Sequence, residues 1–277
     1  MKPFLKWAGG KTQLLPEVLK HVPQSFDTYY EPFIGGGALL FEMQSKRAVI
    51  ADVNAELINC YKVIRDNPDR LMELLDTFPI DEDFFYKMRQ ADRDEAFVMA
   101  SDYWKAARII YLNKTCFNGL YRVNKRGEFN TPWGKKKPGQ SIYDRGQIEA
   151  ISTYLNNNQV TILNSGFNET LKRISKPRIS DGKVFVYCDP PYDVLSETSN
   201  FTGYSVGGFS RQDQTVLKNS VDDLTDLNCK VLLSNADTPF IRNLWKDYEI
   251  ITIESSRAIN SKGAKRGKIN EVLIKNY

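Results

Sequence analysis

The most informative stretch of the chain is Val184-Phe185-Val186-Tyr187-Cys188-Asp189-Pro190-Pro191-Tyr192. An apolar run rich in β-branched and aromatic residues predicts a buried strand, which ends at the acid. Two consecutive prolines have no N–H to donate to a sheet ladder, so the chain must leave the sheet there as an extended loop. We therefore predict a strand followed by a loop that carries one carboxylate, acceptor carbonyls and an aromatic ring.

The position of this loop indicates what it can bind. In an open α/β sheet, ligands bind outside the carboxyl ends of the strands. A carboxylate at Asp189, the proline carbonyls and the ring of Tyr192 suit a planar base that carries an exocyclic amine. The alternative is an ordinary strand exit in which the acid caps a helix.

Length and composition limit the possibilities. A chain of 277 residues can hold one large α/β domain or a core domain with an insertion. The contents of 42% hydrophobic and 26% charged residues are ordinary for a globular protein, and the net charge of +4 is a mild bias toward polyanions. No apolar run reaches membrane-spanning length and the first residues do not form a secretory signal. We predict a cytoplasmic protein with no membrane partner.

Cysteine and histidine usage excludes several kinds of chemistry. The four cysteines show no paired spacing, which indicates a reducing compartment and argues against zinc. The only histidine is His21, so most triads and metal clusters built on imidazole are excluded. We expect no metal, and a reaction that proceeds without a histidine base.

The stretch Phe4–Thr12 contains a glycine pair followed by Lys11, as a phosphate-binding loop does. A Walker A motif needs a glycine where Leu5 stands, so that interpretation fails. The glycine pair beside Trp7 and Lys11 still lets a ligand approach the backbone, with an aromatic wall and a cation for a carboxylate. The alternative is an N-terminal turn with a tryptophan in the core.

A second glycine-rich segment follows. Residues 29–41 predict a strand, a turn with three glycines and a helix, and residues 48–54 predict a second strand that ends in Asp52. Strand, glycine turn, helix, strand and acid form the adenosine-binding half of a nucleotide-binding fold, in which the acid holds the ribose hydroxyls. The alternative role of Asp52 is to cap a helix.

The middle of the chain is helical and charged, and a long periodic run covers Phe97–Leu112. The stretch from residue 113 to residue 137 interleaves lysines and arginines with aromatic residues and asparagines. That mixture supplies phosphate contacts, base stacking and base-edge donors, so it predicts nucleic-acid binding. Lys135–Lys137 alone would be equally consistent with a solvated run of charges.

The α/β pattern then resumes, with strands predicted at 159–163, 184–188 and 230–235 and a closing pair at 249–253 and 271–274. The closing pair brackets a basic loop rich in glycine and serine, which we expect to contact phosphates. We predict a discontinuous α/β domain of residues 1–54 and 152–277, interrupted by a helical, basic insertion of residues 55–151.

The motifs occur in an order that resembles one family. FLKWAGGK, EPFIGGGALLF, Asp52 with Asn54, the basic block NGLYRVNKRGEFNTPWG and DPPY are similar to the motifs of the Dam-type (D12 class, alpha group) adenine-specific DNA methyltransferases, close to the enzymes that methylate GATC. The likeness runs from Phe4 to Asn276. DPPY alone also occurs in other amine methyltransferases, so the combination and order carry the specificity.

The resemblance implies an enzyme that depends on S-adenosyl-L-methionine and has a Rossmann-like α/β fold. That fold has a mostly parallel seven-stranded sheet, an antiparallel final strand and an inserted target-recognition domain. Residues 1–54 and 152–277 would then form the catalytic, cofactor-binding domain, and residues 55–151 the helical DNA target-recognition domain. The resemblance implies methyl transfer to adenine in double-stranded DNA at GATC, by base flipping and direct transfer, in a bacterial cell or a phage-infected host. We expect no obligate protein partner. The implied catalytic residues are Asp189, Pro190, Pro191 and Tyr192. The implied cofactor-binding residues are Trp7, Ala8, Gly9, Lys11, Glu31, Pro32, Phe33, Gly35, Gly37, Asp52, Val53, Phe167 and Asp189.

The resemblance also assigns a DNA-binding set. Arg122 resembles the arginine that reads guanine, Leu120 and Pro132 match contacts to thymine methyl groups, and Phe117 with Asn118 matches the wedge that enters the base stack. With the residues that the two basic segments themselves suggest, the predicted DNA-binding set is Lys6, Asn113, Phe117, Asn118, Gly119, Leu120, Arg122, Asn124, Asn130, Pro132, Lys135, Arg257, Lys265 and Arg266.

One position departs from the family pattern. The family usually places an acid before the phenylalanine that aligns with Phe167, and this chain has Gly166 there. Two consequences are open: a lower affinity for the cofactor, or substitution of the lost contact by Asn164 or Ser165. Methylation of RNA or of another DNA sequence, and a catalytically silent DNA-binding relative, remain the alternative functions.

Overall fold

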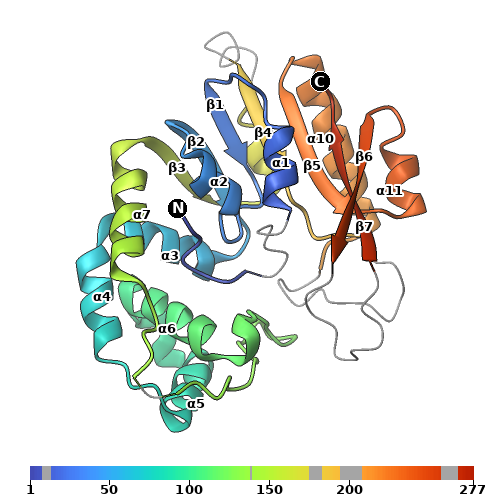
Figure 1. Ribbon diagram of the computed structural model, residues 1–277. Coiled ribbons are helices and arrows are strands. Elements are labelled where there is room, and N and C mark those ends of the chain that lie inside the picture. Colours follow the sequence, from blue (N-terminus) through green and yellow to red (C-terminus); the bar gives the residue numbers. More distant parts are fainter. Residues whose placement is uncertain (8–13, 138, 175–182, 194–207, 257–267) are drawn as a thin grey trace.

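The computed structural model describes residues 1–7, 14–137, 139–174, 183–193, 208–256 and 268–277, and its centre is a seven-stranded sheet (Figure 1). The strands are β1 (Thr28–Glu31), β2 (Arg47–Asp52), β3 (Gln159–Asn164), β4 (Val184–Cys188), β5 (Lys230–Ala236), β6 (Glu249–Ser256) and β7 (Lys268–Lys275).

The sheet has the order β3-β2-β1-β4-β5-β7-β6. Strands β1 to β5 pair in parallel, and β7 is antiparallel to both β5 and β6. The predicted sheet, mostly parallel with an antiparallel final strand, is therefore confirmed. From β1 the chain builds outward on one side and returns to place β4 on the other, so the strand order reverses between β1 and β4. The crevice at such a reversal is where doubly wound folds bind ligands.

Strand β4 shows why the central run is continuously apolar. Phe185 and Tyr187 lie in a hydrophobic cluster on one face of the sheet, while Val184, Val186 and Cys188 lie in a second cluster on the other face. Successive residues of a strand point to opposite faces. Because helices cover both faces, every residue of β4 is buried and no polar alternation can appear in the sequence.

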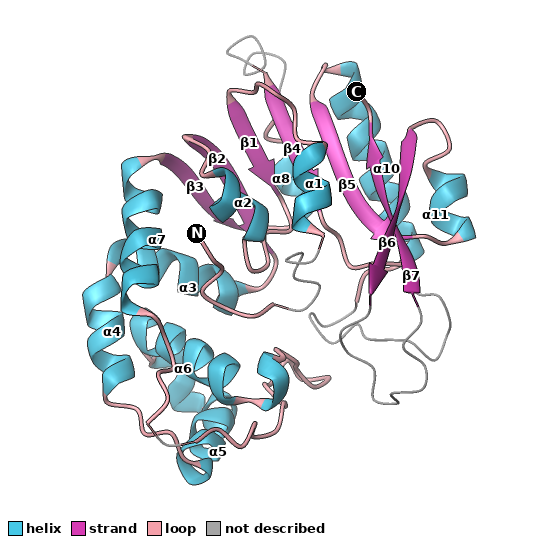
Figure 2. Ribbon diagram, in the orientation of Figure 1, coloured by secondary structure: helices cyan, strands magenta, loops and turns pink. Residues whose placement is uncertain are grey.

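The helices form a layer on each face (Figure 2). The first cluster is completed by α1 (Leu15–Lys20), α2 (Ala38–Met43), α3 (Ala55–Asp66) and α7 (Arg145–Asn157). The second is completed by α8 (Phe167–Leu171), α10 (Arg211–Asp226) and α11 (Pro239–Leu244).

Side chains at the first turns fix where the long helices begin. The Asn54 side chain accepts a hydrogen bond from the Leu57 N–H at the start of α3. Ser210 and Asp213 form a reciprocal capping box at the start of α10. Each cap satisfies N–H groups that have no partner within the helix, and is worth about 1 kcal/mol.

The remaining helices are α4 (Pro68–Asp76), α5 (Glu82–Gln90) and α6 (Asp102–Thr115), with the 3₁₀ turns η1 (Ala91–Arg93), η2 (Glu95–Met99) and η3 (Phe117–Gly119). Figure 1 shows them below the sheet. Helix α6 packs against α3, α4 and α5 and is buried from Ala106 to Asn113. It begins at Asp102, later than the periodic run predicted, because Ser101 is extended and separates it from η2.

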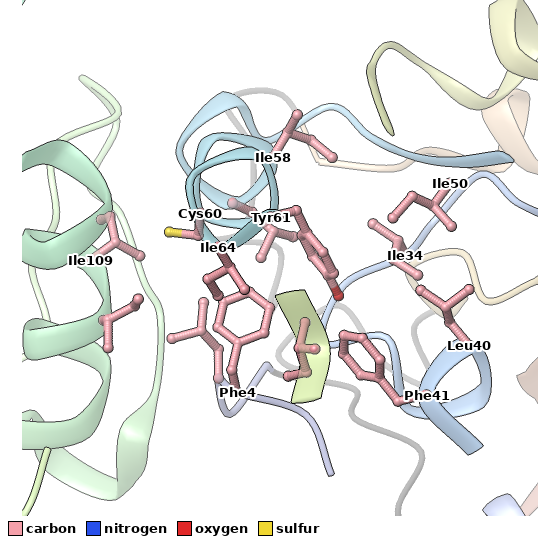
Figure 3. Close-up of a cluster of buried hydrophobic side chains, with 14 of the residues drawn as sticks. Phe4, Ile34, Leu40, Phe41, Ile50, Ile58, Cys60, Tyr61, Ile64 and Ile109 are labelled. Atoms are coloured by element: carbon pink, nitrogen blue, oxygen red, sulfur yellow. The ribbon is translucent and has the colours of Figure 1, made fainter. Parts of the chain in front are cut away.

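The first hydrophobic cluster continues from the sheet into the helical part (Figure 3). Ile50 of β2, Ile34 of the glycine-rich turn between β1 and α2, and Phe41 of α2 surround the ring of Tyr61, which belongs to α3. On the other side of α3 the cluster reaches Ile109 of α6. Helix α3 therefore packs against the sheet with one side and the helical part with the other. Among the described residues, no helix has the length and apolar character needed to cross a bilayer.

Candidate active site

The glycine turn between β1 and α2 forms the first wall of the site. Gly35 and Gly37 have φ angles of +46° and +73°, which residues with a side chain rarely adopt. A Cβ atom on Gly35 would lie 3.0 Å from Cδ1 of Trp7, and one on Gly37 would lie 2.5 Å from the Tyr61 hydroxyl. That hydroxyl donates to the Gly35 carbonyl at 3.0 Å. Both glycines are therefore required by conformation and by space.

Replacing Gly37 by alanine is expected to lower the free energy of unfolding by about 1–3 kcal/mol, because the variant combines left-handed backbone strain with a clash against Tyr61. Thermal unfolding measures the loss. Gly139→Ala is the matched control, since Gly139 has a φ of +81° but open space around its Cβ position. Equal losses in the two variants would show that the clash with Tyr61 contributes nothing.

Asp52 closes the site on the β2 side. Its two carboxylate oxygens accept backbone N–H bonds, one from Gly35 at 3.1 Å and one from Asn54 at 2.9 Å. Burial raises the pKa of the Asp52 carboxyl, and the N–H donors oppose that shift. The Asn164 side chain at the end of β3 donates to the carbonyls of Asp52 and Val53, at 3.0 and 3.2 Å. Asp52 is thus fixed against the glycine turn.

Apolar side chains lie beside Asp52. Phe33 stacks on Phe167 with ring centres 5.4 Å apart, and Phe209 contacts both rings at 5.8 and 5.7 Å. Val53 is 61% exposed, which is unusual for a large apolar residue beside a sheet. Trp7 stands against the glycine turn and stacks on Tyr121 at 4.7 Å. The structure therefore brings together Trp7 and the glycine turn, and Phe33 with Phe167, as the predicted cofactor set requires.

Glu31 ends β1 and is buried. Its carboxylate accepts a hydrogen bond from the Tyr29 hydroxyl at 2.7 Å. Burial raises its pKa well above the ordinary value, the bond from Tyr29 acts against this, and the charge of Asp189 raises the pKa further. Glu31 and Asp189 therefore interact across neighbouring strand ends, and the neutral form of Glu31 is favoured relative to an exposed carboxyl.

The loop after β4 is braced by its neighbours. The Ser234 hydroxyl of β5 donates to Oδ1 of Asp189 at 2.7 Å, which orients that carboxylate. The Tyr192 hydroxyl donates to the Glu271 carboxylate of β7 at 2.8 Å. Gln214 of α10 donates to the Pro191 carbonyl at 2.9 Å. Hydrogen bonds with β5, β7 and α10 thus hold Asp189, Tyr192 and Pro191 of the predicted catalytic set in place.

A second layer of buried polar groups lies behind this loop. The Asp193 N–H donates to Oδ1 of Asn235 at 3.1 Å, and the Asn235 amide donates to Gln214 at 3.1 Å. The Asp193 carboxylate accepts from the Thr238 hydroxyl and from Nε and Nη2 of Arg211, the last two at 2.9 and 3.2 Å. Buried polar networks of this kind fix one arrangement when their members are satisfied.

The residues that brace the loop after β4 were not predicted from the sequence. Ser234 and Asn235 end the predicted strand next to β4, and this position was a usable signal because parallel strands end at one edge. Glu271 reaches the same edge because β7 is antiparallel to β5. Gln214 lies within a helix, where no pattern marked it.

The predicted DNA-binding residues gather around η3 and the segment that follows it. Phe117, which is 55% exposed, donates its N–H to the Pro132 carbonyl at 2.9 Å. The Thr131 hydroxyl donates to the Leu120 carbonyl at 2.6 Å, so Leu120 and Pro132 are held on adjacent segments. Asn118 has a left-handed φ of 57°. The exposed Lys135 follows in the same segment.

Asn113 connects this region to the N-terminal segment. It is 1% exposed, its Oδ1 accepts from the Lys6 N–H, and its Nδ2 donates to the carbonyls of Lys6 and Gly119. A Cβ on Gly119 would lie 2.7 Å from Cδ of Lys6. The pKa of Lys114 is lowered by burial and then by the charges of Lys6 and Lys136. Asn113 therefore positions the exposed Lys6 within a group of cations.

The residues from Tyr121 to Asn130 form a hairpin, closed by a bridge between Val123 and Phe129. Asn124 shapes its turn, because its Oδ1 accepts from the N–H groups of Arg126 and Glu128. Arg122 and Asn130 face each other across the two arms. The Nε of Arg122 donates to Oδ1 of Asn130 at 2.7 Å, and Nη2 donates to the Asn130 carbonyl at 3.2 Å. The predicted guanine reader is thus held by a second predicted DNA-binding residue.

Several predicted residues lie outside the described part of the chain. They are Ala8, Gly9 and Lys11 of the cofactor set and Arg257, Lys265 and Arg266 of the DNA-binding set. Within the described part, no group of three or more His, Cys, Asp or Glu residues is placed to hold a metal ion.

Comparisons with known proteins agree on one family. The family described as D12 class N6 adenine-specific DNA methyltransferase matches residues 7–259. The type II methyltransferase M1.LlaDCHI of Lactococcus lactis subsp. cremoris is 44% identical over 279 residues, which cover 100% of this chain and 96% of that protein. The type II methyltransferase M.MjaIII of Methanocaldococcus jannaschii is 39% identical over 297 residues, with coverages of 100% and 99%.

A third relative is the DNA adenine methylase of Escherichia coli (strain K12), which is 32% identical over 273 residues, with coverages of 98% and 94%. The family match and the three relatives extend over the glycine turn, the loop after β4 and the hairpin described above. On these grounds the chain belongs to the D12 class of N6 adenine-specific DNA methyltransferases.

Proposed function

We propose that this adenine-N6 DNA methyltransferase uses S-adenosylmethionine, flips its target adenine out of the duplex and acts within GATC. The observation that carries the proposal is the arrangement at the carboxyl edge of the sheet. There Asp189, oriented by Ser234, follows β4, next to the glycine turn that follows β1, and Asp52 ends β2 on the far side of β1. One carboxylate faces a base site and the other a nucleoside site.

The described residues fit the cofactor. Each oxygen of Asp52 accepts one backbone N–H, and a carboxylate has about four acceptor positions, so the ribose hydroxyls can also be held. Trp7 and Tyr61 leave no room for a Cβ at Gly35 or Gly37, so the turn beside Asp52 keeps a bare backbone that a cofactor can approach closely. Val53 and Phe167 offer an apolar surface for the adenine ring. When bound, the cofactor would supply a methyl group that is activated by a positively charged sulfur.

The loop after β4 prepares the acceptor nitrogen. The lone pair of an adenine amine is delocalised into the ring, which makes it a weak nucleophile. Hydrogen bonds from the amine to the Asp189 carboxylate and the Pro190 carbonyl favour a more tetrahedral nitrogen with its lone pair available. The ring of Tyr192, fixed through its hydroxyl by Glu271, stacks on the base and aligns it. Alignment of this kind lowers the activation barrier of a direct transfer by several kcal/mol.

Base flipping and site recognition are assigned to residues 55–151, which we propose as the target-recognition domain. Phe117, exposed beside the left-handed Asn118, can enter the stack as adenine leaves it. Arg122 reads guanine, and Leu120 and Pro132 contact thymine methyl groups. Lys6 and Lys135 supply cations for the phosphates and base edges.

Replacing Gly166 by aspartate is expected to tighten cofactor binding by at least about 10-fold, because it restores a charged acceptor next to Phe167. The substitution is sterically allowed: φ is −71°, and a Cβ would lie 3.9 Å from Cγ1 of Val53. The Ser165 hydroxyl already pairs with Thr170, and the Asn164 amide with the Asp52 loop. Calorimetry with S-adenosylmethionine measures the effect.

Gly166→Asn is the matched control for this substitution. Gly166 is the N-cap of α8, where asparagine and aspartate stabilise a helix about equally. Only aspartate adds a charge for the cofactor. Equal dissociation constants for the two variants would mean that an acid here has no role in cofactor binding.

The proposed function is tested by transfer of labelled methyl groups from S-adenosylmethionine to synthetic duplexes. One duplex contains GATC, a second has the same composition with the site scrambled, and a third carries N6-methyladenine on both strands. We expect label on the first duplex alone. Label on the scrambled duplex would contradict the GATC assignment, and the absence of label from all three would contradict the proposed function.

We also propose that the enzyme is the modification component of a restriction system, because the 44% and 39% identical relatives are type II methyltransferases. Plasmid DNA from a host that expresses the chain should resist an endonuclease whose cleavage at GATC is blocked by adenine methylation. Complete digestion of that DNA would contradict a protective role.

A further inference from the structure

Arg108 of α6 is a fully buried cation that no predicted site includes. Its side chain is 0% exposed, and it pairs with two acids: Nη1 lies 3.1 Å from Glu56 of α3, and Nη2 lies 2.7 Å from Asp92 of η1. Its Nε donates to the Met88 carbonyl at 2.7 Å, and Nη2 also donates to the Arg89 carbonyl at 3.2 Å. A buried guanidinium with this many partners has a single orientation.

Each of the two acids that contact Arg108 also anchors one arm of the hairpin. The second oxygen of Glu56 accepts from the Tyr121 hydroxyl at 3.0 Å. Oδ2 of Asp92 accepts from the Phe129 N–H at 2.7 Å. The rings of Tyr121 and Phe129 also pack edge to face at 5.7 Å. Both arms of the hairpin are therefore tied to the same buried cation.

The anchored positions directly precede the two residues that face each other across the hairpin. Tyr121 is followed by Arg122, and Phe129 is followed by Asn130, which accepts the hydrogen bonds from Arg122. The backbone next to Arg122 and the backbone next to its partner Asn130 are thus each tied to a buried acid, through Tyr121 and Phe129. The distance between DNA and the Arg122 guanidinium thus depends on the acids that Arg108 holds.

Tyr121 also contacts the proposed cofactor site. The ring of Tyr121 stacks on Trp7 at 4.7 Å, and Trp7 stands against Gly35 of the glycine turn. The hairpin and the proposed cofactor site therefore share one aromatic contact. A shift of Tyr121 would move both.

We propose that Arg108 is a positioning residue for base recognition: through Glu56 and Asp92 it sets both arms of the hairpin and so aligns Arg122 with its base. The inference rests on the proposed function, since it assigns Arg122 to guanine. It extends that function by assigning specificity to a residue that touches neither DNA nor cofactor.

The test is equilibrium binding of the full chain to labelled duplexes, without turnover. One duplex carries the recognised site, and others carry single base-pair replacements within it. Arg108→Met is expected to lower the ratio of affinities at the guanine read by Arg122 by at least about 5-fold, with smaller changes at other positions. Arg145→Met is the matched control, because Arg145 is an exposed helical arginine paired with Asp76 at 3.4 Å, and it should leave every ratio unchanged.

A double-variant cycle separates positioning from a general loss of structure. If Arg108 acts through Arg122, the variant with both Arg108→Met and Arg122→Ala should discriminate as Arg122→Ala does alone. Thermal unfolding accompanies each measurement. Additive losses in the double variant, or unchanged ratios in folded Arg108→Met, would overturn the proposal.

Tyr121→Phe keeps the inference testable if Arg108→Met fails to fold. It removes only the hydroxyl that bonds to Glu56 and leaves the stack on Trp7 and the Arg108 ion pairs in place. A lower ratio at the same guanine supports the proposal, and an unchanged ratio overturns it. If the wild-type chain does not discriminate among the duplexes at all, the proposed function fails instead.

Discussion

Replacing Asp189 by alanine is expected to lower methyl transfer to adenine by at least about 10²–10³-fold, the usual effect of removing one preorganised polar group from a reaction centre. The carboxylate is oriented by Ser234 and lies at the carboxyl end of β4. In the proposed reaction it accepts a hydrogen bond from the target amine. The affinity for duplex DNA should change little, because phosphate and base contacts come from other residues. Single-turnover methylation and equilibrium binding separate the two effects.

Two further variants sharpen this result. Asp247→Ala removes an exposed carboxylate and should leave transfer unchanged. Ser234→Ala leaves Asp189 in place without its orienting hydroxyl and should reduce transfer by a smaller factor than Asp189→Ala. Turnover by Asp189→Ala at the wild-type rate would show that the carboxylate has no part in the reaction.

Replacing Arg122 by alanine is expected to lower the discrimination against a substituted base pair by about 1–3 kcal/mol, or roughly 5- to 150-fold, because a bidentate contact to guanine is lost. The fork geometry of Arg122 is shaped by Asn130, which accepts from both Nε and Nη2. Rates of methylation on duplexes with single replacements in the site give the ratio at each position. The loss should be confined to one guanine.

Arg126→Ala is the matched control for Arg122→Ala. Arg126 lies at the exposed turn of the same hairpin and carries the same charge. Its loss should weaken binding to all duplexes alike and reduce the salt dependence, as expected for a phosphate contact. If Arg122→Ala also weakens all duplexes alike, Arg122 is a phosphate contact and the base assignment is wrong.

The sheet could be predicted from the sequence because it is built from local signals. The apolar runs that end in Asp52 and Asp189 are strands that stop at those residues or one residue before them, and the closing pair at the C-terminus forms the antiparallel edge. The resemblance to D12 adenine methyltransferases is confirmed by the family match. These features rest on hydrophobic patterning and on motif order, which are visible along the chain.

The contacts that fix the site are between segments far apart in the sequence, and no local pattern encodes them. Asp189 and Ser234 are 45 residues apart in the sequence, and they come into contact because β4 and β5 pair. Asn113 was expected to contact DNA, yet its side chain binds Lys6 and Gly119 within the protein. Composition indicates a binding region, but it does not separate the residues that touch DNA from those that support them.

The central claim is tested most directly by sequencing-based mapping of adenine methylation in plasmid DNA from a methylation-free host that expresses this chain. We expect N6-methyladenine at GATC on both strands and at no other motif. Methylation at another motif would contradict the roles of Arg122, Leu120 and Pro132 while keeping the chemistry of Asp189. Unmethylated DNA in cells that contain the folded protein would contradict the proposed reaction itself.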